Sequence, residues 1–360
     1  MLPRRVPAFT PARWAATVLA AATLALAGCK IETSGGDLSS TSGASGGSGS
    51  AATSAPSGPS TAGALIIEPN AGFGAVYSLI THARHSVDLT MYELSDHTAE
   101  ADLGAAAKRG VDVQVVLDHK EKSTNTDAYD YLRTHDVKVV WSWSKYEYTH
   151  QKTLVVDGSE AVIMTANLTT QYYPTSRDFL VTDTSHADVD AITATFDADF
   201  AHHSITPSDG QDLVWSPTDS QDQLLGLING ARHSLRIYSE EMGDAAIEKA
   251  LVAAAKRGVD VQVCAENSDG EYDSAFAKLT KGGVHVSYYS SSTGFYIHGK
   301  VVEADYGDSG AKVFIGSENF SSASLNHNRE LGLITANREV MSGIATDFST
   351  DFSHGQKYSS

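Results

Sequence analysis

The chain has 360 residues, of which 26 are Lys or Arg and 44 are Asp or Glu, so its formal net charge at pH 7 is −18. Proteins that bind nucleic acids usually present a basic field, and a surface this acidic repels a phosphate polymer at long range. The charge therefore disfavours duplex nucleic acid as a partner. The length allows two domains of about 150 residues, and the only two cysteines, Cys29 and Cys264, provide no disulfide framework.

Residues 1–28 have the pattern of an export signal. Three arginines precede an apolar run from Trp14 to Leu26, which at roughly 13 residues is shorter than the 20 or so that span a bilayer. The following Leu-Ala-Gly-Cys is similar to the bacterial lipoprotein signal, which implies that Cys29 becomes the lipidated first residue of the mature protein. An ordinary cleaved signal peptide and a membrane anchor are the alternatives.

Residues 29–62 are dominated by Gly, Ser, Thr and Ala. This composition cannot bury a core and is typical of a flexible tether, with a root-mean-square span of roughly 30 Å. Together with the signal, the tether predicts an exported protein that is lipid-anchored to a bacterial membrane and faces the periplasm or the exterior.

The segment after the tether alternates between helix and strand patterns. Apolar residues recur at helical spacing over 73–83 and alternate as in a strand over 87–91 and 111–115, while an Ala-rich stretch before Gly110 suits a helix. Gly110 stands where a left-handed helix end favours glycine. Further apolar runs lie at 153–156 and 161–164. The pattern predicts an α/β unit, a β-sheet flanked by helices.

The same pattern occurs twice. The run AAAKRGVDVQV at 105–115 returns unchanged at 253–263, an offset of 148 residues that becomes 152 after a four-residue insertion near 308–311. Two repeats of this length are too few and too long for a solenoid. We therefore expect two pseudo-symmetric halves, residues 63–207 and 208–357, within one monomeric chain.

Each half contains one HxKxxxxD motif. The first motif has His150, Lys152 and Asp157, and the second has His298, Lys300 and Asp305. On an extended segment, side chains two residues apart point to the same face. Two copies predict one shared site at the interface between the halves.

These motifs and the residues that follow them resemble the phospholipase D superfamily, over about residues 63–355. An asparagine and then an acid follow each histidine: Asn167 and Asp178 in the first half, Asn319 and Glu330 in the second. The second half also has the Gly-Ser-x-Asn pattern of the family at 316–319, whereas the first half has Met-Thr-Ala-Asn at 164–167.

The resemblance implies covalent phosphodiester chemistry without a metal. His150 is the expected nucleophile, which would form a phosphohistidine, and His298 is the expected acid and base; the residues alone leave the two roles interchangeable. The acids Asp178 and Glu330 would orient the imidazoles. The phosphate oxygens would be held by six side chains: Lys152, Lys300, Asn167, Asn319, Thr165 and Ser317.

The motif aspartates, Asp157 and Asp305, lie five residues beyond their lysines, at the far end of a short strand, so we expect them to have a structural role. No cofactor and no metal site are predicted. The paired histidines at 82 and 85 and at 202 and 203 have no further ligands at recognisable spacing, and the chain has no GxxxxGK sequence followed by Ser or Thr, as a phosphate-binding loop requires.

A phospholipid presented by a membrane fits an exported, anchored, acidic protein best. The resemblance implies hydrolysis of a phosphatidylcholine-like lipid to phosphatidic acid, or transfer to an alcohol instead of water. The polar loop with Tyr172 and Tyr173 could enter a lipid headgroup region or stack on a nucleic-acid base, and the residue types alone do not decide between the two. The alternatives are an exported nuclease, a phosphatidyltransferase similar to cardiolipin or phosphatidylserine synthases, and a surface lipoprotein that only binds headgroups.

Overall fold

The computed structural model describes residues 62–359. The predicted signal peptide, Cys29 and all of the predicted tether except its last residue lie outside this range. Ala62, which was assigned to the tether, is instead the first residue of strand β1, because its backbone pairs with Asp183 of the neighbouring strand. No helix in the described part of the chain is both long and apolar enough to cross a membrane.

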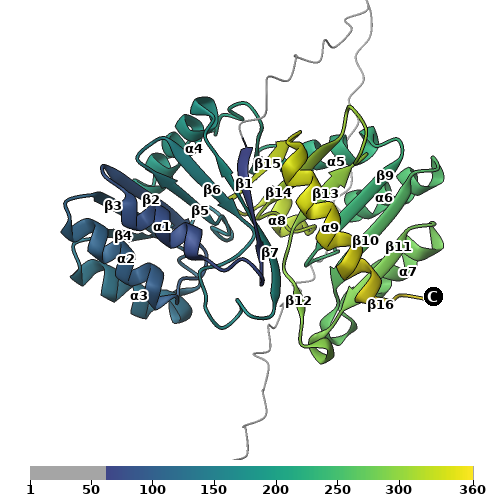
Figure 1. The fold of residues 1–360 in the computed structure, drawn as a ribbon, viewed down its shortest axis with the longest axis horizontal. Helices are drawn as coiled ribbons and strands as arrows, with labels where there is room; N and C mark the ends of the chain where they lie inside the picture. Colours follow the sequence, from purple (N-terminus) through teal and green to yellow (C-terminus); the bar gives the residue numbers. More distant parts are fainter. Residues whose placement is uncertain (1–61, 360) are drawn as a thin grey trace, which may run out of the picture. The chain divides into compact units, whose positions relative to one another are not determined.

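The first half is a mixed sheet with helices on its two faces (Figure 1). Its strands occur in the spatial order β1-β7-β6-β5-β2-β3-β4, in which β2, β3 and β4 are parallel and the others antiparallel. The elements are β1 (Ala62–Glu68), α1 (Gly74–His82), β2 (Ser86–Met91), α2 (His97–Lys108), β3 (Asp112–Leu117), α3 (Lys122–Thr134), β4 (Lys138–Trp141), β5 (Thr153–Val156), β6 (Glu160–Met164), β7 (Ser176–Asp183) and α4 (His186–Phe200).

The second half repeats this strand order as β8-β15-β14-β13-β9-β10-β11, with β16 added at the edge. Its longer elements are β8 (Leu213–Ser216), α5 (Ser220–Gly230), β9 (Ser234–Ser239), α6 (Ala245–Lys256), β10 (Asp260–Glu266), α7 (Asp273–Lys281), β11 (His285–Tyr289), β13 (Val301–Ala304), β14 (Lys312–Gly316), β15 (Glu330–Thr335) and α9 (Arg338–His354). The short ones are β12 (Tyr296–Ile297), α8 (Ser322–Asn326) and β16 (Gln356–Lys357). The predicted α/β fold with two similar halves is confirmed.

Matching residues begin and end matching helices. The carboxylates of Asp96 and Asp244 accept backbone N–H bonds from the first turns of α2 and α6, and so satisfy donors that have no partner within the helix. After these helices, Gly110 and Gly258 adopt φ of +92° and +94°, a conformation that a side chain disfavours. The helix ends therefore follow from local sequence, which is the same in both halves.

Three apolar cores hold the molecule together. One lies within each half, and the third contains residues from both, including Phe179, Val181, Tyr238, Ile315 and Phe348. Cys264 is buried in this shared core. Helix α9 of the second half packs against its own strands β9, β10 and β11 and also against β1 of the first half. The halves therefore share a buried interface, and burial of apolar surface is its main source of stability.

Candidate active site

Short backbone contacts between the halves place each histidine beside the acid of the opposite half. Strand β12, just before the second motif, pairs with Ser176 and Arg177 at the start of β7. In the first motif, Thr149 forms the corresponding bridge with Arg329. Because an acid follows each arginine, Asp178 and Glu330 lie next to the opposite half's histidine.

The two imidazole–carboxylate pairs are crossed between the halves. Nδ1 of His150 lies 2.7 Å from Oε2 of Glu330, and Nδ1 of His298 lies 2.7 Å from Oδ1 of Asp178. The histidine side chains are only 13% and 14% exposed. A carboxylate on Nδ1 directs the other ring nitrogen, Nε2, toward a reacting group.

The lysines of the two motifs are both buried beside these histidines. Lys152 Nζ donates to the carbonyl of His150 at 2.6 Å, and Lys300 Nζ donates to that of His298 at 2.5 Å. Burial, the largest cause, and the charge of Lys300 lower the pKa of Lys152 to about 7, although the charges of nearby glutamates oppose the shift. The charge of Lys300 therefore acts on Lys152 across the interface between the halves.

The surroundings of His150 favour the neutral form of its imidazole. Burial lowers the pKa of this imidazole, and although Glu330 opposes the shift, Lys152 and Lys300 add to it. The ring of Tyr92 packs edge-on against that of His150, with 4.6 Å between centroids. A neutral imidazole in an aromatic and cationic environment suits a nucleophile.

Buried hydroxyl and amide groups hold the two acids in place. Glu330 accepts hydrogen bonds from Ser324 Oγ at 2.6 Å and Asn328 Nδ2 at 2.9 Å, and Asp178 accepts one from Thr165 Oγ1 at 2.6 Å. Burial acts to raise the pKa of Glu330, but its contacts with His150, the charge of Lys152 and the bond from Ser324 lower it overall. Glu330 therefore stays ionised and holds its histidine in one orientation.

The predicted phosphate-binding role of Thr165 and Ser317 is wrong. Both side chains are wholly buried. Thr165 Oγ1 bonds to Asp178 and accepts the N–H of Phe179, and Ser317 Oγ accepts the N–H of Leu331. Their hydroxyls face strands β7 and β15 because the residues sit at the ends of the neighbouring strands, so they support the acids from behind.

Asn167 and Asn319 lie at the site, and their amides are turned toward acids that the sequence reasoning missed. Asn167 Nδ2 donates to Glu93 Oε2 at 3.2 Å, and Asn319 Nδ2 donates to Glu240 Oε2 at 3.0 Å. Glu93 and Glu240 follow strands β2 and β9 at the sheet edge that carries the motifs, but an acid after an apolar strand does not by itself indicate a site.

The motif aspartates cap backbone amides at the other end of the motif strands. Asp157 accepts N–H bonds from residues 84–86, with a shortest distance of 2.6 Å, and Asp305 does the same for residues 232–234. Backbone hydrogen bonds lower the pKa of both carboxyl groups, although burial opposes the shift.

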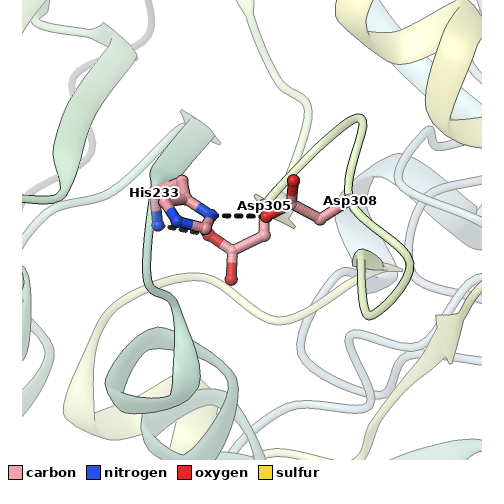
Figure 2. A group of neighbouring side chains, drawn as sticks. All are labelled: His233, Asp305 and Asp308. Atoms are coloured by element: carbon pink, nitrogen blue, oxygen red, sulfur yellow. Dashed lines mark hydrogen bonds and ion pairs between the residues drawn. The ribbon is translucent and has the colours of Figure 1, made fainter.

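A cluster of His233, Asp305 and Asp308 lies at this far end of the second half (Figure 2). His233 Nδ1 pairs with Asp308 Oδ2 at 2.5 Å, and Asp308 lies in the insertion that distinguishes the halves. Both oxygens of Asp305 already accept main-chain N–H bonds. The cluster is therefore explained as an anchor for the inserted loop.

The aromatic loop after Asn167 divides into two roles. Tyr173 stacks on Phe73 and donates to Asp96, so it belongs to the packing of α2. Tyr172 is 44% exposed, and burial together with the charges of Glu93 and Glu121 raises the pKa of its hydroxyl. Tyr172 is thus the member of the loop that is available at the rim of the site.

Two crossed half-sites on a duplicated α/β fold define the paired-motif phospholipase D class. The family model described as "Cardiolipin synthase, PLD-like domain" matches residues 76–202 and 224–352, which is more than half of the chain. The chain therefore belongs to this phospholipase D-like family, and it carries the paired His and Lys residues of the enzymes of that superfamily.

Individual proteins are similar to this chain in sequence or in fold. Cardiolipin synthase A of Pseudomonas syringae pv. syringae (strain B728a) is 25% identical over 338 residues, covering 82% of this chain and 69% of the relative. Phosphatidylserine synthase of Haemophilus influenzae Rd KW20 has a similar fold, with a TM-score of 0.63, 11% identity and coverage of 82% and 87% of the two chains. Polyphosphate kinase of Porphyromonas gingivalis also has a similar fold, with a TM-score of 0.63 and 16% identity. The match covers 80% of this chain and 50% of the kinase.

Proposed function

We propose that this chain is a phosphatidyl-transferring enzyme that acts on a phospholipid through a phosphohistidine. The observation that carries the proposal is the pair of crossed imidazole–carboxylate contacts, each 2.7 Å long. They present two Nε2 atoms in one site with two buried lysines, which is what an attack on phosphorus and protonation of a leaving oxygen require.

The proposed reaction has two steps. In the first, Nε2 of His150 forms a bond to phosphorus, the bond from phosphorus to the headgroup oxygen breaks, and His298 donates its Nε2 proton to that oxygen. In the second, His298 takes a proton from the acceptor hydroxyl, the acceptor oxygen bonds to phosphorus, and the N–P bond breaks. Lys152 and Lys300 stabilise the negative charge on the non-bridging oxygens throughout.

The acceptor decides the product. Water gives phosphatidic acid, the hydrolysis expected from the sequence, whereas an alcohol gives a new phosphodiester. The family description and the name of the Pseudomonas relative both concern cardiolipin synthase. They support an alcohol, such as the hydroxyl of a second lipid headgroup, as the preferred acceptor.

Product analysis by mass spectrometry tests the proposal. The protein is incubated with mixed phosphatidylglycerol and phosphatidylethanolamine vesicles in ¹⁸O-labelled water with ethanol and EDTA, beside His150→Ala. We expect cardiolipin or phosphatidylethanol to exceed ¹⁸O-labelled phosphatidic acid, with none of the three from the variant. Phosphatidic acid alone would restrict the activity to hydrolysis, and no product would overturn the proposal and direct the search to other diesters.

We also propose that Cys29 anchors the enzyme to the membrane that supplies its substrate. The support is the Leu-Ala-Gly-Cys sequence and the tether that follows it. In a bacterial host, the wild type should fractionate with membranes and Cys29→Ser should appear in the soluble exported fraction. Equal membrane association of both would refute lipidation at this residue.

A further inference from the structure

Glu240 places a carboxylate among the groups that hold the phosphate in the proposed reaction. Its Oε2 lies 2.6 Å from Lys300 Nζ, 3.0 Å from Asn319 Nδ2 and 3.6 Å from His298 Nε2. Its Oε1 accepts the hydroxyl of Tyr296 at 2.9 Å. The second half-site therefore already contains a negative charge.

The first half-site lacks this feature. The residue 148 positions before Glu240 is Tyr92, whose ring lies 4.8 Å from Lys152 Nζ. Among the described residues, Lys152 has no carboxylate within ion-pairing distance, whereas Lys300 is paired with Glu240. At this one position the two halves thus differ in charge, because the first half has an aromatic ring and the second half has an acid.

The carboxylate of Glu240 stays ionised. Burial acts to raise its pKa, but the charges of His298 and Lys300 hold that pKa well below the usual range. Glu93, the corresponding contact of Asn167, differs in this respect, since burial and the charge of Glu121 raise its pKa. The negative charge of Glu240 offsets the positive charge of Lys300. The side chains that would hold the phosphate can therefore balance about one negative charge on a ligand.

We infer that Glu240 is a specificity-determining residue that makes the site select monoanionic phosphodiesters over dianionic phosphomonoesters. A diester has one negative charge, which Lys152 can balance together with Lys300, although Lys300 is also paired with Glu240. A monoester has a second charge that must lie near the Glu240 carboxylate and is repelled. The product phosphatidic acid is such a monoester, so this selection would also limit inhibition by the hydrolysis product.

The inference rests on the proposed function, because the diester is the proposed substrate, but it can be tested without turnover. Binding of methyl phosphate and of dimethyl phosphate is measured by calorimetry at pH 6.8, below the pKa of Lys152 near 7, so that this lysine keeps its charge. There a phosphomonoester, with a second pKa near 6, is mainly a dianion, and dimethyl phosphate is a monoanion. The quantity of interest is the ratio of the two dissociation constants.

For the wild type we expect dimethyl phosphate to bind at least as tightly as methyl phosphate. Glu240→Gln should strengthen methyl phosphate binding relative to dimethyl phosphate by about tenfold, which corresponds to about 1.4 kcal/mol. Glu240→Asp keeps the charge and should stay nearer the wild-type ratio. Glu339→Gln removes an exposed carboxylate in the first turn of α9, away from the site, and should leave the ratio unchanged.

A wild-type preference for methyl phosphate, or the same ratio in wild type and Glu240→Gln, would overturn the inference. The wild-type comparison holds even if the variant fails to fold. If the ratios shift as expected but no phospholipid is turned over, the proposed function fails and charge selection by Glu240 stands. If phospholipid is turned over and the ratios do not shift, the proposed function stands and the inference fails.

Discussion

At the scale of single residues, the two histidines have the same carboxylate contact and different surroundings. His150 packs against Tyr92, whose ring also lies over Lys152, whereas Nε2 of His298 lies 3.6 Å from Glu240. The geometry therefore supports the neutral nucleophile and the proton donor that the resemblance implies for His150 and His298. These roles lead to two predictions.

Replacing the acid that orients the nucleophile should lower the rate without unfolding the protein. Glu330→Gln keeps the shape of the side chain but no longer holds the imidazole in its active tautomer, so we expect kcat to fall by about 10²- to 10⁴-fold. The control is Glu339→Gln, an exposed carboxylate in the first turn of α9. Equal kcat values for both variants would show that the 2.7 Å contact is not functional.

The activity should be confined to a narrow pH range. The pKa of His150 is lowered from 6.5, so the nucleophile becomes protonated and inactive only below that pH. The pKa of Lys152 is lowered to about 7, so its charge is present below pH 7 and is lost as pH rises above it. We expect kcat/KM to decline above about pH 7 and Lys152→Arg, which stays charged, to extend the alkaline side. An unchanged kcat/KM from pH 6.5 to 9 would contradict this account.

At the scale of elements, each motif strand has a chemical end and a structural end. The histidine and lysine precede β5 and β13, and the aspartate that follows each strand caps the turn before β2 or β9. The motif therefore combines catalysis with the placement of one strand beside another. Separate effects on rate and stability should follow.

Asp157→Ala and Asp305→Ala should each lower the free energy of unfolding by about 1–3 kcal/mol, because three backbone N–H groups, one of them half-buried, lose their charged acceptor. Since the pKa of each carboxyl is lowered in the folded protein, this stabilisation is present above the unfolded pKa, near 4, and is lost as pH falls through the folded value. Urea unfolding at pH 7 and at pH 3 measures both effects. A large loss of kcat with unchanged stability would assign the aspartates to catalysis instead.

Much of the fold could be predicted because it depends on local signals. Strand alternation, Gly110 and the 148-residue offset are visible in the chain itself. The direction of the Thr165 hydroxyl could not be predicted, because it depends on which strand lies beside Thr165 in the sheet. Glu240 was also missed, because one acid after an apolar strand gives no signal until the sheet brings it to Lys300.

At the scale of the whole molecule, each half contributes an arginine that pairs with an acid of the other half. Arg177 of the first half pairs with Asp351 of α9 at 2.6 Å, and Arg329 of the second half pairs with Asp199 of α4 at 2.8 Å. All four side chains are buried. Each arginine immediately precedes a site acid, so the same contacts that join the halves also position Asp178 and Glu330.

Arg177→Met should leave Asp351 buried without its partner and lower the free energy of unfolding by about 3–5 kcal/mol. The double variant Arg177→Met with Asp351→Leu removes both charges, and we expect it to recover part of that loss. Because strand β7 carries Asp178, the single variant should also lower kcat. If urea unfolding shows less than about 1 kcal/mol of change, this ion pair does not hold the halves together.

The central claim is that two halves build one covalent site with His150 as its nucleophile. The most direct measurement is peptide mapping by mass spectrometry after an acid-free quench of the protein with a phosphodiester that has an activated leaving group, using wild type, His150→Ala and His298→Ala. We predict a phosphoryl adduct on His150 that accumulates in His298→Ala, because deprotonation of the acceptor is lost, and is absent in His150→Ala. An adduct on His298, or one that persists in His150→Ala, would contradict the account.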